Sequence, residues 1–306
     1  MSRILVTGKD GQVGFELPGR LERAGQITAT GRGELDLSDP GSIRRCIREL
    51  KPDLIVNAAA YTAVDQAESE PELAMAVNGI APGIIAEEAK RAGAVLIHYS
   101  TDYVFDGTKG RPYAEDDAPA PINVYGRTKL AGERAIQAVD VPHLILRTSW
   151  VYGMRGKNFL LTMLRLGRER DELRIVDDQI GAPNWSGAIA AATGDIVLRL
   201  GCGQPGFVDA CARQSGVYHL SATGQTSWHG FAAAIFAHAA GAQRGHCDFA
   251  LERVPALKPI PTAQYPLPAR RPHYSLLANG KLQRAFGVTM PEWKSSLAEC
   301  MRGGMR

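Results

Sequence analysis

The sequence has no long apolar run and little imbalance of charge. No stretch approaches the roughly 20 consecutive apolar residues that a membrane-spanning helix needs. The N-terminus, MSRILVTGKDG, carries an apolar segment too short for the core of a signal peptide. The 306 residues include 35 basic and 32 acidic side chains, a formal charge of +3, with no long block of Lys or Arg. We therefore expect neither a membrane partner nor a nucleic-acid partner.

Cysteine is scarce, and its pattern indicates no disulfide framework. The five cysteines are Cys46, Cys202, Cys211, Cys247 and Cys300, an odd number without a C-x-x-C pair. This favours free thiols in a reducing compartment, and we expect a cytoplasmic protein. The seven histidines show no metal-ligand spacing, so the sequence predicts no metal site.

Short aliphatic runs alternate with helical patterns through the first half of the chain. Runs typical of strands buried on both faces occupy residues 3–8, 27–30, 53–60, 94–101 and 143–150. The clearest helix lies between the third and fourth runs at 71–93, where apolar residues recur every three or four positions and Pro82 is a point of kinking. This alternation predicts an α/β fold with a doubly wound parallel sheet.

The alternation weakens after residue 150, which predicts a second, smaller domain. We expect a dinucleotide-binding domain at 1–150, rejoined near 216–240, and a mainly substrate-binding domain at 151–306. Within the second half we expect helices at 159–170 and 227–241, strands at 173–183 and 216–222, an excursion at 201–216, and a proline-rich loop with little regular structure at 254–272. The Tyr and Arg content of that loop favours contact with a ligand.

Three glycines follow the first predicted strand directly. Gly8, Gly11 and Gly14 form a G-x-x-G-x-x-G pattern that opens a helix. Such glycines allow a tight turn, a close approach of a pyrophosphate to backbone amides, and close packing of the helix on the strand. The alternative is a purely structural turn, but the position at the first strand-to-helix turn favours dinucleotide binding.

The second predicted strand ends near residues that read the adenosine ribose in such folds. Arg32 suits the extra phosphate of NADP, whereas Glu34 or Asp36 suits the ribose hydroxyls of NAD. Because Arg32 comes first after the strand, between two glycines, we expect NADPH, with NADH possible. The alternative for Arg32 is an ordinary surface arginine.

A tyrosine and a lysine lie four positions apart in VYGRTK. On a helix Tyr125 and Lys129 would share one face, so the ammonium would favour the phenolate and lower the pKa of the tyrosine. The spacing also occurs by chance on solvated helices. Thr101 and Asp102 follow the fourth strand, where they are either a turn or the polar edge of a ligand site. Together with the glycine loop, the two motifs favour a ligand site over a turn.

The motifs TGKDGQVG, NAAAYTAVDQAE, HYSTDYVFDG, VYGRTKLAGE, LRTSWVYG and DDQIGAP occur in this order. The chain thereby resembles the extended short-chain dehydrogenase/reductase family and, within it, the dTDP-4-dehydrorhamnose reductases. The likeness runs from residue 3 to about 185, and it returns in GVYHLSATGQTSWHGFA and near 262–276. It implies reduction of the C4 keto group of a dTDP-sugar, the last step of dTDP-L-rhamnose synthesis, and hence a link to lipopolysaccharide O-antigen.

The resemblance also implies a role for each matching position. Tyr125 would protonate the sugar C4 oxygen, Lys129 would assist it and bind the nicotinamide ribose, and Thr101 would orient the same oxygen. Asp102 and Trp150 would contact substrate with Val64 and Asp65 nearby, although residue type alone favours core packing for Trp150. The residues expected to contact the cofactor are Gly8, Gly11, Gln12, Val13, Arg32, Asp36, Leu37, Ala58, Ala60, Tyr61, Thr62, Tyr99, Tyr125 and Lys129.

Two departures from the resemblance bear on partners. Asn184 and Trp185 stand where similar proteins often have Thr and a small residue, which leaves the sugar pocket open in detail. The stretch NWSGAIAA lacks the carboxylate through which some members hold Mg²⁺ between subunits, so we expect a monomer or weak homodimer without metal. The remaining alternatives are another nucleotide-sugar epimerase, dehydratase or reductase, and a non-catalytic regulatory subunit.

Overall fold

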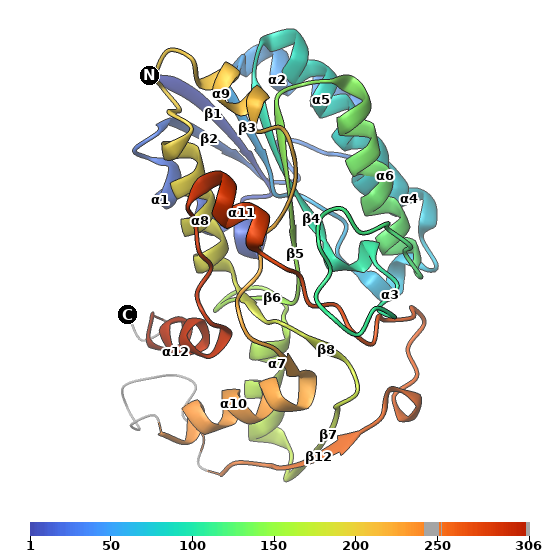
Figure 1. The fold of residues 1–306 in the computed structure, drawn as a ribbon. Helices are drawn as coiled ribbons and strands as arrows, with labels where there is room; N and C mark the ends of the chain where they lie inside the picture. The colour runs from blue at the N-terminus through green and yellow to red at the C-terminus, as the bar shows by residue number, and fades with distance from the viewer. Residues whose placement is uncertain (242–250, 252, 304–306) are drawn as a thin grey trace.

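A parallel sheet forms the centre of the computed structural model, which describes residues 1–241, 251 and 253–303. The strand order is β10-β5-β4-β3-β1-β2 (Figure 1). Its strands are β1 (Ser2–Thr7), β2 (Gly25–Thr30), β3 (Leu54–Asn57), β4 (Val95–Thr101), β5 (His143–Thr148) and β10 (Gly216–His219). In the middle of the sheet Val56 lies opposite both Val6 and Ile97. The predicted parallel α/β sheet is confirmed.

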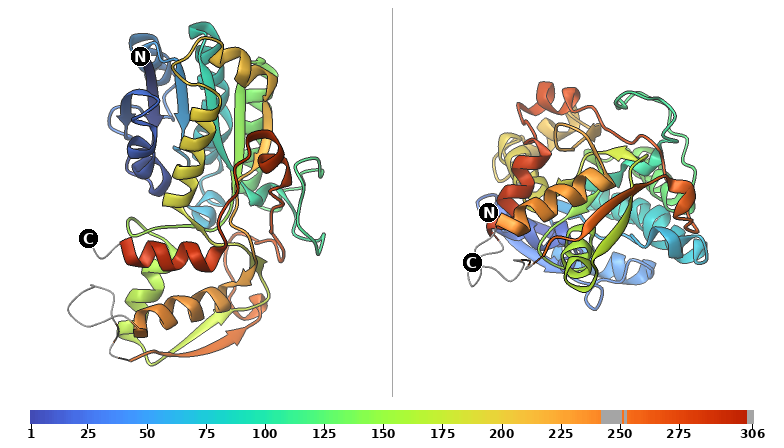
Figure 2. Two further views of the ribbon diagram at one scale, coloured as in Figure 1. Left: turned by 60° about the vertical axis from the view of Figure 1, so that its left-hand side comes forward. Right: turned by 90° about the horizontal axis from the view of Figure 1, so that it is seen from below.

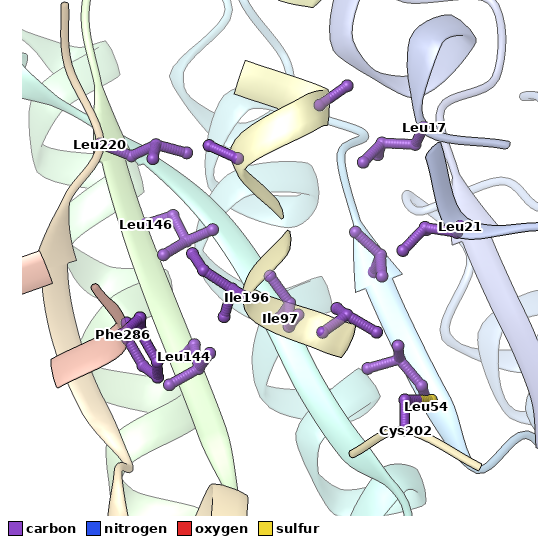
Figure 3. Packing of buried hydrophobic residues seen from close by; sticks show 14 of the residues in the cluster. Leu17, Leu21, Leu54, Ile97, Leu144, Leu146, Ile196, Cys202, Leu220 and Phe286 are labelled. Carbon is purple, nitrogen blue, oxygen red and sulfur yellow. The ribbon is translucent and has the colours of Figure 1, made fainter. Parts of the chain in front are cut away.

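Helices cover both faces of the sheet, which explains why β3 and β4 are buried along their whole length (Figure 2). One face carries α1 (Gln12–Leu21), α8 (Ser186–Arg199), α9 (Phe207–Arg213) and α11 (Gly280–Phe286). The other carries α2 (Pro40–Leu50), α5 (Ala81–Ala92) and α6 (Val124–Val139). Figure 3 shows the apolar cluster on the first of these faces, where Ile196 of α8 lies beside Ile97 of β4 and Leu17 of α1 belongs to the same cluster.

The helix predicted at 71–93 is interrupted by a π-helical turn. It comprises α4 (Pro71–Met75), the π-helical η1 (Ala76–Ile80) and α5. The Ala81 amide donates to the Ala76 carbonyl, five residues back, just before Pro82, which has no amide hydrogen to continue the regular ladder. The expected kink is therefore a π-bulge, and it places Asn78 in the interior.

Two expectations for the second half are wrong. Residues 201–216 are not an excursion: they contain α9, and Phe207 and Cys211 enter the core beneath the sheet. Residues 254–272 are not all loop, because β12 (Ala256–Ile260) pairs in parallel with β7 (Glu172–Val176). Pro259 is tolerated there because β12 is an edge strand with one paired neighbour.

A second lobe lies beyond the carboxyl edge of the sheet (Figure 1). It consists of α7 (Phe159–Glu169), α10 (Trp228–Gly241), α12 (Trp293–Gly303), β7 and β12, which share an apolar core of their own. Two short strand pairs join it to the sheet: β6 (Val151–Tyr152) with β9 (Asn184–Trp185), and β8 (Ile180–Gly181) with β11 (Thr226–Ser227). The short helices α3 (Val64–Ala67), η2 (Asp102–Val104) and η3 (Thr262–Gln264) complete the structure.

Residues 261–279, the return segment, lead the chain from the second lobe back to the sheet. Arg271 binds Asp65 of α3 through two hydrogen bonds of 2.9 and 2.6 Å. The Asn123 side chain donates to the Arg270 carbonyl at 2.7 Å, and Leu277 pairs with Tyr113. These contacts fix the return segment against α3, the N-cap residue of α6 and the loop at Tyr113.

Candidate active site

A cavity of about 750 Å³ lies where the carboxyl ends of the strands face the second lobe. This is the edge at which doubly wound folds bind ligands, and the volume suits an extended small molecule. The residues predicted from sequence to touch cofactor or substrate all line it: Gly8, Gly11, Gln12, Val13, Arg32, Asp36, Leu37, Ala58, Ala60, Tyr61, Thr62, Tyr99, Thr101, Asp102, Tyr125, Lys129 and Trp150. The fold thus gathers them at one site, while their individual roles stay predictions.

The glycine loop presents a cradle with open amides. Gly11 is the N-cap residue of α1 and no side chain caps this helix, while Gly11, Gln12 and Val13 line the cavity. Gly8 has a φ of +75°, and a Cβ there would lie 2.8 Å from the Ala59 nitrogen. A Cβ on Gly14 would lie 2.0 Å from the Gly8 oxygen. A pyrophosphate fits this cradle, since amide donors and the positive end of a helix favour an anion.

The rim beyond the glycine loop contains the groups that are expected to distinguish NADPH from NADH. Glu34 accepts from the Gly31 amide at 2.8 Å and pairs with Lys9. Asp36 accepts from the amide and hydroxyl of Ser38, and these bonds hold the pKa of its carboxyl below the ordinary value. Arg32 is exposed at the rim. The two carboxylates are therefore occupied within the protein, which leaves the arginine as the group that fits a ribose phosphate.

The loop after β3 forms the inner wall of the cavity. Asn78, from the π-helical turn, accepts from the Tyr61 amide and donates to the Tyr61 carbonyl, both at 2.9 Å. The same amide group donates to the Thr128 hydroxyl at 3.3 Å. Asn78 therefore ties the loop that carries Ala60 and Thr62 to the helix that carries Lys129.

Tyr125 lies in the first turn of α6. Asn123 caps this helix by accepting from the Gly126 amide at 2.7 Å, and the ring of Tyr103 meets that of Tyr125 edge to face. Burial raises the pKa of Tyr125 to about 12, although a hydrogen bond with Thr101 opposes the shift. The expectation that Lys129 lowers this pKa is not met, because the Lys129 amine points to the Tyr99 carbonyl and to His98.

Lys129 is one of the largest fully buried side chains in the described part of the protein. Its Nζ donates to the Tyr99 carbonyl at 2.7 Å and lies 3.2 Å from Nε2 of His98. Burial lowers the pKa of Lys129 to about 8, with the charge of Glu133 acting in the opposite direction. A lysine of this kind can gain or lose its proton near neutral pH.

Asp102 and Trp150 lie on the side of the cavity that faces the second lobe. Burial raises the pKa of the Asp102 carboxyl to about 6, against hydrogen bonds from Ser275 and Thr101. Trp150 has a φ of +44°, and its ring stacks on Trp228 with centroids 3.6 Å apart. Core packing alone does not describe Trp150, because its ring is part of the cavity wall.

Several residues of the cavity wall were not predicted from the sequence. Thr148 ends β5 and Ser149 follows it, where the rule that ligands bind at carboxyl ends of strands would have found them. Trp228 and Lys157 carry no local signal, since only the folding of the second lobe brings them to the wall. Of the two residues expected nearby, Val64 lines the cavity, whereas Asp65 binds the return segment.

The remaining expectations concern metal, thiols and membranes. Within residues 1–241, 251 and 253–303 there is no group of three His, Cys, Asp or Glu side chains able to hold a metal ion. Cys46, Cys202, Cys211 and Cys300 are free thiols, and Cys247 lies outside the described residues. No helix in the same part of the chain is long and apolar enough to cross a membrane.

Comparison with known proteins identifies the family. Residues 1–304 match the family described as RmlD substrate binding domain. The dTDP-4-dehydrorhamnose reductase of Burkholderia thailandensis is 48% identical over 300 residues, covering 98% of each chain, and that of Escherichia coli K12 is 45% identical, covering 95% and 94%. A crystal structure of dTDP-4-dehydrorhamnose reductase from Bacillus anthracis in complex with NADP is 34% identical, with a TM-score of 0.85 and 99% of each chain covered. The chain belongs to the dTDP-4-dehydrorhamnose reductase family.

Proposed function

We propose that this protein reduces the C4 keto group of dTDP-4-dehydro-β-L-rhamnose with NADPH to give dTDP-L-rhamnose, the last step of dTDP-rhamnose synthesis. The observation that carries the proposal is a single cavity that joins an anion cradle at Gly11 to the Tyr125–Lys129 pair. The relatives named dTDP-4-dehydrorhamnose reductase, and the solved relative that binds NADP, support the substrate and coenzyme.

The chain contributes the proton and the positioning. The Gly8–Val13 loop would hold the pyrophosphate and Arg32 the ribose phosphate, and the bound nicotinamide would supply a hydride to C4. Tyr125 donates its phenolic proton to the C4 oxygen, so that the ketone becomes a secondary alcohol. A pKa of about 12 keeps this phenol protonated at neutral pH.

Neighbouring groups orient the carbonyl and balance charge. The Thr101 hydroxyl, which donates to Asp102 at 3.1 Å, lies at the end of β4 on the same cavity wall as Tyr125, where it can meet the sugar oxygen. Asp102, with a pKa of about 6, is mostly ionised above neutral pH and can accept from a sugar hydroxyl. Lys129 lies one helical turn from Tyr125, and its amine, held by the Tyr99 carbonyl and His98, would bind the nicotinamide ribose.

The first experiment is oxidation of NADPH, with NADH in parallel, on adding dTDP-4-dehydro-β-L-rhamnose, with the product identified by mass. We expect dTDP-L-rhamnose and faster turnover with NADPH. Cofactor binding without oxidation of intact substrate would contradict the proposal. That result would move the assignment to another nucleotide sugar or to a regulatory subunit.

We further propose the division into a cofactor domain at 1–150 and a mainly substrate-binding domain at 151–306. Two separate apolar cores support it, as does the pairing of β10 with β5 near the expected return at 216. The expected return to the cofactor domain extended to residue 240, but its last part forms α10, which packs in the second lobe. We also propose that the protein is a monomer or weak homodimer in the cytoplasm. The free thiols support a reducing compartment.

A further inference from the structure

Three polar side chains form a row across the middle of the sheet. Thr7, Asn57 and His98 are in register on the neighbouring strands β1, β3 and β4, and each is about 1% exposed. The row ends at Lys129 of α6, which is 2% exposed. Burying four polar groups is costly unless all are hydrogen-bonded, so the row calls for an explanation beyond the fold.

Hydrogen bonds connect the side chains of the row, and the donor and acceptor of each bond can be assigned in turn. The Ala59 amide donates to Thr7 Oγ1 at 3.2 Å, and the Thr7 hydroxyl donates to Asn57 Oδ1 at 2.6 Å. Asn57 Nδ2 then lies 3.0 Å from Nδ1 of His98. Because an amide nitrogen only donates, Nδ1 must accept, which leaves the imidazole proton on Nε2.

This proton arrangement restricts the state of Lys129. The Nε2–H group of His98 faces Lys129 Nζ at 3.2 Å. A neutral amine can accept this bond through its lone pair and still donate to the Tyr99 carbonyl. An ammonium has no lone pair and needs Nε2 as acceptor. Protonating Lys129 therefore requires the imidazole proton to move to Nδ1 and the Asn57 amide to turn, so that its oxygen faces His98.

The groups around Lys129 allow it to be either a neutral amine or an ammonium. The ionisable groups facing Lys129 are His98 from β4 and, on α6 itself, Tyr125 and Glu133; Glu133 is ion-paired with Arg147 of β5 at 2.6 Å. Burial and the Lys129 charge hold the pKa of His98 well below its ordinary value, so the ring stays neutral. The pKa of Lys129 is about 8. One proton thus changes at Lys129, while His98 exchanges between two neutral tautomers.

We propose that Thr7, Asn57 and His98 form a hydrogen-bond switch that positions Lys129 and couples its proton to the tautomer of His98 and the orientation of the Asn57 amide. His98 and Asn57 are then positioning residues, acting on the reaction through Lys129. Thr7 and Asn57 directly precede Gly8 and Ala58 of the cavity wall, so the switch links the cofactor side of the site to the catalytic helix. The catalytic consequence rests on the proposed function, whereas the tautomer exchange does not.

Histidine-ring ¹H–¹⁵N spectra of the protein without substrate test the switch directly. His98 is assigned by the signal lost in His98→Gln. We expect the Nδ1–H tautomer at pH 6.5, the Nε2–H tautomer at pH 10, and a midpoint near the Lys129 pKa of about 8. His143, whose Nδ1 donates to the Val141 carbonyl at 2.8 Å, is an internal reference for the first tautomer. One unchanging tautomer, or an imidazolium at His98, would overturn the proposal.

Variants separate the switch from a merely structural row. Lys129→Met removes the titrating amine, so His98 should keep one tautomer from pH 6.5 to 10. Asn57→Asp offers only acceptors to Nδ1 and should hold the Nδ1–H tautomer throughout. Asn78→Asp adds the same carboxylate beside Thr128 and Tyr61 instead of His98, and should retain the tautomer exchange. Exchange that persists in Lys129→Met would contradict the coupling.

The catalytic consequence is read from the pH profile. Asn57→Asp leaves Nε2 free to accept from the ammonium, so the alkaline limb of kcat/KM should move upward by about one pH unit. An unmoved limb in a variant whose His98 tautomer is locked would show that the switch does not reach the reaction. If the wild-type protein shows the tautomer exchange but no turnover of the sugar nucleotide, the proposed function fails and the switch stands.

Discussion

Gly14→Ala tests whether the cofactor cradle depends on the contact between α1 and the turn after β1. A Cβ at this position would lie 2.0 Å from the Gly8 oxygen and 2.6 Å from the Gly8 carbonyl carbon, where ordinary contacts begin at 3.4 Å. Both partners are backbone atoms that cannot rotate away. The helix start must therefore shift by more than about 1 Å relative to the strand, an overpacking strain of about 1–3 kcal/mol.

That shift displaces the open amides of Gln12 and Val13, which are expected to hold the pyrophosphate. We expect NADPH to bind at least about tenfold more weakly, since geometry errors of this size are costly for charge-assisted hydrogen bonds. Fluorescence titration measures the Kd, and thermal unfolding measures the loss of stability. The KM for the sugar nucleotide should change little at saturating NADPH.

Gly19→Ala is the matched control in the same helix. Gly19 is exposed, and a Cβ there meets nothing within 4 Å. This variant should keep the affinity for NADPH and gain about 0.5–1 kcal/mol, because alanine is the better helix former. NADPH affinity of Gly14→Ala within twofold of wild type, at unchanged stability, would refute the reasoning.

Three further predictions concern single groups of the site. Tyr125→Phe should lower the rate constant of the reduction step about 10²–10⁴-fold in single-turnover assays, with the Kd for NADPH unchanged. A near-normal rate constant would show that Tyr125 is not the proton donor. Arg32→Gln should raise the KM for NADPH at least about tenfold and leave that for NADH, unlike the exposed control Arg23→Gln; equal effects on both coenzymes would exclude a phosphate contact. Because the folded pKa of Asp102 is raised to about 6, its stabilising contribution is lost as pH rises from 4 to 6. Asp102→Asn should therefore gain thermal stability relative to wild type across that window, and a pH-independent difference would show that this carboxyl is not buried as described.

Local patterns were sufficient for much of the fold and for the grouping of the site. Aliphatic runs located the strands up to β5, because strands buried on both faces leave continuous apolar segments. The spacing of Tyr125 and Lys129 indicated a catalytic pair. The rule that ligands bind at the carboxyl edge of a parallel sheet then predicted which other residues would lie near them. The family resemblance supplied the roles that spacing alone left open.

Other features depend on tertiary packing and have no local pattern. Pro82 predicted a kink near Ala76–Ile80, but its form as a π-bulge also depends on packing where α6 crosses: a Cβ on Gly132 would lie 2.2 Å from the Asn78 oxygen. Trp228 reaches the cavity wall only because α10 packs in the second lobe. The direction of Lys129 toward His98 was also missed, since a helical wheel places a side chain on a face without naming its partner.

The route of the chain between the two halves limits how the protein can be divided. A fragment ending near residue 150 would lack α8, leaving apolar residues of β1, β3 and β4 uncovered on one face. It would also lack β10, so β5 would become an exposed edge with Leu144 and Leu146 beside it. Such an edge is a template for aggregation. Recombination or truncation at the apparent border between cofactor and substrate halves should therefore yield insoluble products, and exchange of substrate specificity among relatives is better sought in wall residues than in whole-domain swaps.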